Sequence, residues 1–278
     1  MPSQAKHAGR CAAKKKSPIF AVCAVLFAAA AVMIGVSLLI LFGPDRPFDV
    51  GDRQSDSPVN VSYSVPHTER GVLAVRPICQ YPDWPTGCEI VSAAIVLDFN
   101  GIDVSVATLV DDYLPQSLDF YYPNGNIFAM RRGPDLRKVF VGDPRSENSY
   151  GCFAPVIVQL MRDHLSAIGQ DPSRVRETTG TSLDDLCRDY IDKGIPVIVW
   201  ATRDMMEVRQ GATWRLDDGT EFTFPTGEHC LVLIGYTETT FTFADPGKTA
   251  YATYPRDVVL ARFADLGKQS VVLIPEDS

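Results

Sequence analysis

The sequence has few of the residue patterns that bind metals or phosphates. It contains four histidines, none of them closely spaced, and no Cys-x-x-Cys pair, which disfavours a zinc site. It also lacks a glycine-rich loop of the kind that cradles phosphate and the Gly-x-Ser-x-Gly elbow of serine hydrolases. We therefore expect neither a metal nor an organic cofactor.

Basic residues are scarce outside the N-terminal tail. The chain has a net charge of −8, and leaving out the five tail cations gives 21 Lys and Arg against 34 Asp and Glu, a net charge of −13. A surface of this charge repels nucleic acid over a Debye length, and no basic stripe offsets it. We therefore expect no nucleic-acid partner, and we attribute most of the acidity to solubility.

The first 44 residues contain no acidic side chain, and residues 19–42 carry no charge at all. A cleaved secretory signal has an apolar core of roughly 7–15 residues, whereas a membrane-spanning helix needs about 20. We predict a cytoplasmic basic tail at 1–17 and an uncleaved signal-anchor helix at 18–42, with a removed signal peptide as the alternative. By the positive-inside rule, the rest of the chain lies outside the cytoplasm.

Residues 43–70 are rich in small and polar residues and predict a flexible linker. The remaining residues, 71–278, suffice for one domain with a full core. Residues 72–78 predict a short strand or extended segment, and helical patterns follow at 88–99, about 105–114, 153–168 and 182–193. Strand-like runs then lie at 195–200, 213–216, 221–224, 229–236, 240–245, 250–253 and 269–274, with a short helix at 255–266. The order predicts an α+β fold with a helical N-terminal half and an antiparallel sheet in the C-terminal half.

Cys88 follows a segment that Pro82, Pro85 and Gly87 keep from forming regular structure, and a helical pattern begins at the cysteine itself. Unpaired N–H groups and the macrodipole at a helix start favour an anion, so we expect them to lower the pKa of this thiol. Gly87 is expected to allow the sharp backbone turn that exposes the side chain. The alternative is a buried structural cysteine.

The histidines differ in their surroundings. His7 and His67 fall in the tail and the linker, and His164 lies mid-helix beside charged residues, where a solvated face is expected. His229 opens an apolar strand-like run, and an imidazole there can take the proton of a nearby thiol. A structural histidine at the mouth of a core strand is the alternative.

Asp245 ends the next strand-like run. A hairpin that turns near residues 237–239 places His229 opposite Asp245 or one diagonal step away, on the same face of the sheet. A carboxylate in that place orients an imidazole through its other nitrogen. The alternative is a turn aspartate before Pro246 and Gly247.

Gln80 lies upstream of Cys88 across the proline-rich loop. Its amide, together with the backbone N–H of Cys88, is placed to donate to a developing oxyanion; an ordinary polar loop residue is the alternative. Five cysteines lie beyond the predicted membrane helix, namely Cys79, Cys88, Cys152, Cys187 and Cys230. One free thiol with two disulfides and five unpaired thiols both stay open.

Together these motifs resemble the peptidase C39-like family, bacterial relatives of the papain-fold peptidases, over nearly all of 71–278. The resemblance is carried by Cys79-Gln80-Tyr81-Pro82, Pro85-Thr86-Gly87-Cys88-Glu89, Gly151-Cys152-Phe153-Ala154-Pro155-Val156-Ile157, Pro196-Val197-Ile198-Val199-Trp200, Glu228-His229-Cys230 and Asp245-Pro246. It implies a papain-like fold whose two halves meet at a cleft. It also implies a role for each site residue: Cys88 as nucleophile, His229 as base, Asp245 as orienting carboxylate and Gln80 as oxyanion donor.

This chain departs from the better-known family members, which trim double-glycine leader peptides and are fused to ABC transporters with a cytosolic peptidase. We expect no fused transporter and an outward-facing domain here, and Trp84 stands where a smaller aliphatic residue is expected. We therefore expect a membrane-anchored extracellular cysteine peptidase that acts on a peptide or protein substrate through an acyl-enzyme. The alternatives are an acyltransferase or cell-wall peptide hydrolase with the same triad, and a catalytically silent peptide-binding module.

Overall fold

The computed structural model describes residues 72–276, which belong to one compact unit. The predicted basic tail at 1–17, signal-anchor helix at 18–42 and linker at 43–70 lie outside the described residues. Between residues 72 and 276, no helix is long and apolar enough to cross a membrane.

A six-stranded antiparallel sheet forms the centre of the described unit. Its strand order is β3-β10-β4-β7-β8-β9, and every neighbouring pair is antiparallel. The strands are β3 (Val175–Glu177), β4 (Val197–Thr202), β7 (Glu228–Tyr236), β8 (Thr240–Ala244), β9 (Tyr251–Pro255) and β10 (Ser270–Leu273). The central strands β4 and β7 are nearly continuous apolar runs, as expected for strands that are buried on both faces.

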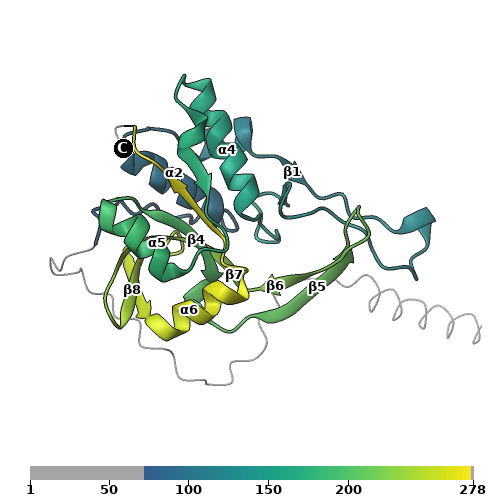
Figure 1. The fold of residues 1–278 in the computed structure, drawn as a ribbon. Coiled ribbons are helices and arrows are strands. Elements are labelled where there is room, and N and C mark those ends of the chain that lie inside the picture. The colour runs from purple at the N-terminus through teal and green to yellow at the C-terminus, as the bar shows by residue number, and fades with distance from the viewer. Residues whose placement is uncertain (1–71, 277–278) are drawn as a thin grey trace, which may run out of the picture. The chain divides into compact units, whose positions relative to one another are not determined.

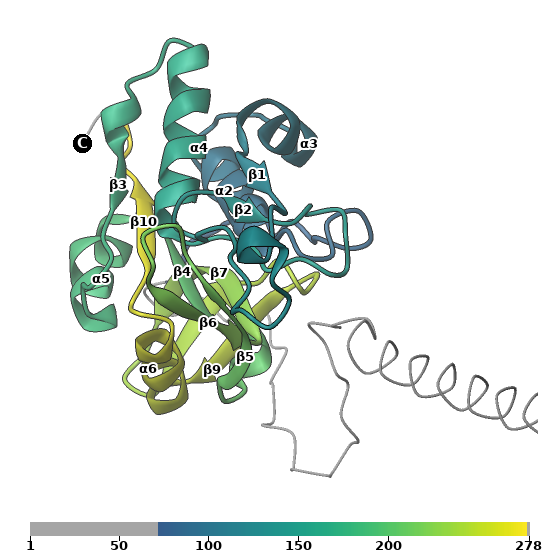
Figure 2. The ribbon, with the colours of Figure 1, turned by 90° about the vertical axis from the view of Figure 1, so that its right-hand side faces the viewer.

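Helices cover both faces of this sheet (Figure 1, Figure 2). The longer ones are α2 (Cys88–Phe99), α4 (Ala154–Ala167), α5 (Leu183–Asp189) and α6 (Arg256–Asp265). Helices α2 and α4 share one core with Ile198 and Trp200, whereas α5 and α6 share the other with Val197 and Val199. Because successive strand residues point to opposite faces, the single run 197–200 contributes to both cores.

Shorter elements complete the described part. They are α3 (Val106–Thr108), β1 (Gln116–Ser117), β2 (Phe140–Val141), β5 (Arg209–Arg215), β6 (Glu221–Thr226), a π-helical turn at Leu109–Tyr113, and 3₁₀ turns at Pro123–Gly125, Pro172–Arg174, Ile191–Lys193 and Arg203–Met205. The β5–β6 ribbon extends away from the main sheet (Figure 1). Its buried Trp214 packs with the preceding loop in a third apolar cluster, which includes Leu136, Tyr150 and Phe224.

The predicted mixture of helices and an antiparallel sheet is confirmed, but the two are not segregated along the chain. The helix predicted at 255–266 is α6, and it covers the second face of the sheet together with α5. The helix predicted at about 105–114 is a single turn, α3, continued by the π-helical turn, and Ser105 caps it by accepting the N–H of Thr108 at 3.0 Å. Residues 72–78 form no strand, although the N–H of Leu73 donates to the carbonyl of Ile234.

The prediction that His164 lies on a solvated helix face is wrong. Its side chain is 5% exposed, and the ring of Tyr113 packs edge-on against it with 5.3 Å between centroids. Neither ring nitrogen has a hydrogen-bond partner in the described part of the chain, and burial lowers the pKa of this histidine. The π-helical turn that carries Tyr113 covers this face of α4, and the sequence pattern did not place it there.

Candidate active site

Cys88 is the first residue of α2, and its side chain is 5% exposed. Gly87 precedes the helix with a φ of −102°, which any residue can adopt, and Cys88 is buried, so the prediction that Gly87 turns the backbone sharply to expose the Cys88 side chain is wrong. Glycine is favoured at this position because a side chain would have too little space. A Cβ at this position would lie 3.0 Å from the Cβ of Trp84 and 3.2 Å from that of Pro144.

His229 and Asp245 meet at the open end of the β7–β8 hairpin. Val232 pairs with Ala244, a register that places His229 one diagonal step from Asp245 on the same face of the sheet. The imidazole Nε2 lies 2.7 Å from the Asp245 Oδ1, and the two side chains are 4% and 2% exposed. The hairpin thus joins a buried imidazole to a buried carboxylate.

Asp245 has further partners that stabilise its negative charge. The backbone N–H of Gly247 donates to the same Oδ1 at 2.8 Å, and Lys248 contributes a nearby positive charge. Burial alone would raise the pKa of Asp245, but these groups and His229 outweigh it and hold the pKa below its ordinary value. The carboxylate is therefore ionised when it contacts the imidazole.

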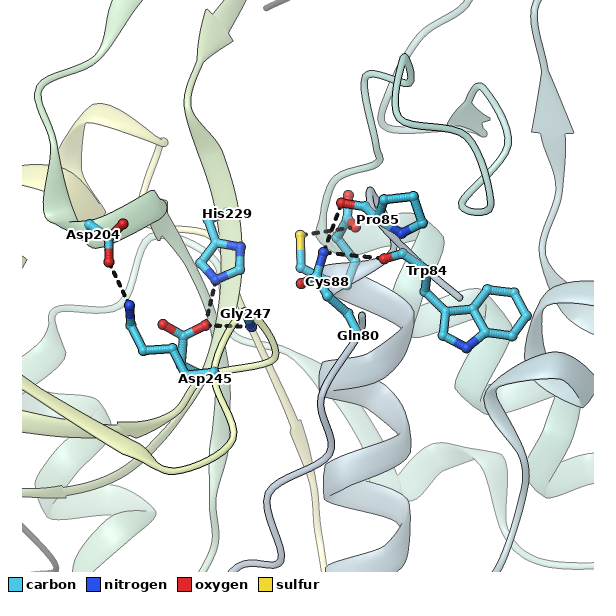
Figure 3. A network of polar contacts seen from close by, with 10 residues as sticks. Gln80, Trp84, Pro85, Cys88, Asp204, His229, Asp245 and Gly247 are labelled. Atoms are coloured by element: carbon cyan, nitrogen blue, oxygen red, sulfur yellow. Dashed lines mark hydrogen bonds and ion pairs between the residues drawn. The ribbon is translucent and has the colours of Figure 1, made fainter. Parts of the chain in front are cut away.

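The sulfur of Cys88 faces this hairpin from the start of α2. In Figure 3 the sulfur and the ring of His229 point toward each other across the space between α2 and β7. The backbone N–H of Cys230, the residue after His229, lies against the sulfur. The N–H of Gln80 donates to the carbonyl of Pro246 at 2.8 Å and so ties the loop before α2 to the loop after β8. The structure therefore brings all four predicted site residues together.

Gln80 is 1% exposed, and its side-chain amide holds the loop in front of α2. Its Nε2 donates to the carbonyl of Trp84 at 3.2 Å and to that of Pro85 at 2.9 Å (Figure 3). Its Oε1 is buried and has no hydrogen-bond partner among residues 72–276. Both donor positions of the amide are occupied in this state, so its role at an oxyanion stays a prediction.

The expected lowering of the pKa of Cys88 is wrong for this state of the protein. Burial raises the pKa of Cys88 well above its ordinary range, the charges of Glu89 and Glu228 add to the rise, and the N–H of Cys230 offsets only part of it. The thiol donates to the Glu89 Oε2 at 3.3 Å. Burial, together with the nearby negative charges, outweighs the helix start, and the sulfur is held as a thiol.

Glu89 and Glu228 are site residues that sequence reasoning missed. Glu89 is fully buried, and its Oε1 accepts the N–H of Cys152 at 2.7 Å. Burial raises the pKa of Glu89 to about 7, and burial together with the charge of Glu89 raises that of Glu228 well above its ordinary value. A signal was present in the sequence, because each glutamate directly adjoins a predicted catalytic residue and an apolar run.

These groups form the one cation-sized cluster of donor atoms within the described residues. The Cys88 sulfur and one oxygen each of Glu89 and Glu228 lie within 4.8 Å of one another. Both oxygens of Glu89 already accept hydrogen bonds, from Cys88 and from Cys152. We therefore interpret the group as an acid–thiol cluster. The five cysteines of the described part are all free thiols, which answers the open question of disulfides.

A cavity of about 470 Å³ lies apart from these residues, between the β5–β6 ribbon, the start of α4 and the end of α6. Phe153, Phe222 and Leu266 give it apolar walls, and Arg137 and Arg209 also line it. None of Cys88, His229, Asp245 and Gln80 lines it. We do not take this cavity as the candidate active site, because neither the His229 imidazole nor the Cys88 thiol lines it.

The family model of the peptidase C39-like family matches residues 72–271. This chain belongs to the peptidase C39-like family. The match spans α2, the β7–β8 hairpin and the loops between them, so the family covers the whole candidate site.

Known proteins from two Bacillus species are similar to this chain. The uncharacterized protein YvpB of Bacillus subtilis (strain 168) is 28% identical over 188 residues, which cover 67% of this chain and 68% of YvpB. The crystal structure of a putative C39-like peptidase from Bacillus anthracis matches with a TM-score of 0.63 and 24% identity, covering 75% of this chain and 99% of that chain. The second likeness shows the fold.

Proposed function

We propose that this protein is a cysteine peptidase that cleaves amide bonds in a peptide or protein substrate. The observation that carries the proposal is the buried 2.7 Å contact between His229 and Asp245, with the sulfur of Cys88 facing the imidazole from the start of α2 (Figure 3). Asp245 engages the Nε2 of His229, which leaves Nδ1 as the ring nitrogen that exchanges a proton with the thiol.

The reaction uses His229 as a proton carrier twice. Cys88 gives its proton to His229, and the sulfur forms a bond with the substrate carbonyl carbon. The imidazolium then protonates the leaving amine as the C–N bond breaks, and a thioester to Cys88 remains. His229 next takes a proton from water, whose oxygen attacks the thioester carbon. The C–S bond breaks, the imidazolium returns the proton to the leaving sulfur, and the carboxylic acid and the free thiol are released. Asp245 orients the ring and stabilises its positive charge in both steps.

The first 44 residues support a location for this activity. An uncharged run at 19–42 after five cations favours a signal-anchor, and the positive-inside rule then puts residues 71–278 outside the cytoplasm. The proposal is therefore a membrane-anchored enzyme with an extracytoplasmic domain. Added protease should digest the C-terminal domain on intact cells if it faces outward, and should spare it until the cells are opened if it faces inward.

A silent peptide-binding module is the second candidate, and one observation favours it. Cys88 is buried, its pKa is raised, and its thiol donates to Glu89. A thiol that stays in this state would hold a peptide without cleaving it. The same observation is compatible with a peptidase if the protonation state of Glu89 changes during its working cycle.

The test is peptide cleavage by the purified full-length chain, followed by mass spectrometry with a peptide library. We expect cleavage by the wild type, a thioester-bound acyl group on Cys88 after rapid acid quench, and neither with Cys88→Ala. If the wild type and Cys88→Ala cleaved the peptides equally, the cleavage would come from a contaminating peptidase. Peptide binding by both proteins without cleavage by either would favour the silent module.

A further inference from the structure

We propose that Glu89 is a further residue of the catalytic site, whose carboxylate holds the Cys88 thiol protonated and whose protonated form releases it to His229. The inference rests on the proposed function, because it concerns the nucleophile of that reaction. Its basis is the pair of hydrogen bonds through which Glu89 joins the Cys88 sulfur to the backbone N–H of Cys152.

The position of Glu89 is fixed by its surroundings. The residue is fully buried in the first turn of α2, and the N–H of Cys152 holds its Oε1 at 2.7 Å. Gly151, at a φ of +80°, leaves the space for the carboxylate, since a Cβ there would lie 2.2 Å from the Glu89 Oε1. The other oxygen, Oε2, is thereby aimed at the sulfur, 3.3 Å away.

The charge of Glu89 acts on both members of the thiol–imidazole pair. It opposes a thiolate on Cys88, and it favours a positive charge on His229. The first effect is the larger, because Oε2 is hydrogen-bonded to the sulfur whereas His229 contributes least to the pKa of Glu89. An ionised Glu89 therefore favours the thiol over the thiolate–imidazolium pair.

Other titratable groups face this cluster from each packed element. They are Glu228, His229 and Cys230 of β7, Cys152 before α4, Arg203 beside Glu228, and Asp245 behind His229. Burial and the charge of Glu89 raise the pKa of Glu228, and the charge of Arg203 opposes that rise. Glu89, with a pKa of about 7, is the group that changes charge near neutral pH.

The proton balance of the step is simple. When Glu89 takes up a proton from solvent, it stops accepting from the Cys88 thiol. The S–H proton then passes to the Nδ1 of His229, and the protonated Glu89 can donate to the resulting thiolate. Activation is therefore favoured below about pH 7, opposite to the behaviour of an ordinary thiol, which reacts faster as the pH rises.

The test is the alkylation rate of each cysteine by iodoacetamide, resolved by mass spectrometry on the full-length chain from about pH 5 to 9. We expect Cys88 to react roughly tenfold more slowly at pH 8 than at pH 6, because an adjacent negative charge disfavours the thiolate. Cys79, which is only partly buried and far less enclosed, should react faster as the pH rises and serves as the internal control.

Glu89→Gln keeps the shape and the Cys152 contact but cannot ionise. We expect this variant to lose the decline above pH 7 and to react at least about tenfold faster than wild type at pH 8. Glu221→Gln, which makes the same chemical change at an exposed position on β6, should leave the Cys88 profile unchanged.

A rate for Cys88 that rises through pH 7 in the wild type, or that coincides in wild type and Glu89→Gln, would overturn the inference. The pH profile of Cys88 alkylation in the wild type tests the inference even if Glu89→Gln does not fold. These outcomes are separate from peptide cleavage. A pH-independent but cleaving enzyme would refute the role of Glu89 alone, whereas a pH-switched thiol that never forms an acyl-enzyme would refute the peptidase.

Discussion

The candidate site has a hairpin side, formed by His229 and Asp245, and a helix side, formed by Cys88 and Glu89. The two sides differ in how completely their polar groups are paired. On the hairpin side, Asp245 accepts from His229 and from the N–H of Gly247, and its pKa is lowered despite burial. On the helix side, burial raises the pKa of Cys88 and of Glu89. The base is organised for proton transfer, whereas the nucleophile is held as a thiol. The difference indicates that activation depends on the helix side.

The two sides also differ in how they are assembled. His229 and Asp245 come from adjacent strands, so the hairpin register alone places them together. The helix side combines Glu89 of α2 with Cys152 of a loop and Glu228 of β7, which meet only in the folded chain. Variants of the two sides should therefore fail in different ways.

The largest effect is expected from His229→Ala. Loss of the general base should lower kcat/KM for peptide cleavage by about a thousandfold or more, because acid–base groups contribute roughly 10²–10⁴ in rate. Steady-state kinetics with a cleaved library peptide measure this loss. A decrease below about tenfold would mean that the hairpin side does not supply the base.

Asp245→Asn should cost about a hundredfold or more in kcat, since the ring loses the carboxylate that fixes its tautomer. It should also change acid stability. The lowered pKa of Asp245 stabilises the fold above its ordinary value of 3.8, and this contribution is lost as the pH falls through the lower folded value. Unfolding by urea near pH 7 and near pH 3 should show a smaller difference in the variant. Equal pH dependence in both proteins would contradict a pre-ionised Asp245.

Glu89→Gln should have the opposite effect on the pH dependence of stability. The unfolded chain releases this proton near 4.5 and the folded chain near 7, so the wild type loses stability as the pH rises between these values. The loss corresponds to about 3 kcal/mol, at about 1.4 kcal/mol for each pKa unit. Urea unfolding should therefore show the variant gaining on the wild type at pH 8 and not at pH 4. If the difference in stability between variant and wild type were the same at pH 4 and pH 8, the raised pKa of Glu89 would be contradicted.

Trp200→Phe should destabilise the fold by about 2 kcal/mol and also disturb the helix side. The indole N–H of Trp200 donates to the carbonyl of Cys152 at 3.0 Å, and its loss leaves a buried acceptor unpaired. Trp214→Phe is the matched control, because that buried indole donates to the carbonyl of Pro134 in a different cluster. Thermal unfolding should show a similar loss of stability in both variants, whereas the pH profile of Cys88 alkylation should change only in Trp200→Phe. Identical profiles would mean that Cys152 does not position Glu89.

Local patterns in the sequence predicted much of this fold. The apolar runs at 197–200 and 229–236 place β4 and β7, and the turn near 237–239 fixes the pairing of His229 with Asp245 to within one step. Gly194, with a φ of +81°, ends the helical segment where the pattern predicts a stop. These features depend on residues that are close together in the sequence.

Features that depend on distant segments could not be predicted in this way. His164 is buried by Tyr113, and the pKa of Cys88 is raised by groups that the first-turn helix argument did not include. A propensity pattern gives the face of a helix but not the element that covers it. The charges at a helix start are likewise outweighed by burial and by carboxylates that packing brings closer.

The most direct test of the account is whether the sulfur of Cys88 and the ring of His229 lie in contact. Dibromoacetone carries two alkylating carbons separated by one carbonyl, so it bridges a thiol and a ring nitrogen only when they are neighbours. We predict one bridged product on the full-length chain, whose proteolytic fragments join Cys88 to His229. An adduct on Cys88 whose second arm stays free or reaches another side chain would contradict the proposed nucleophile–base pair.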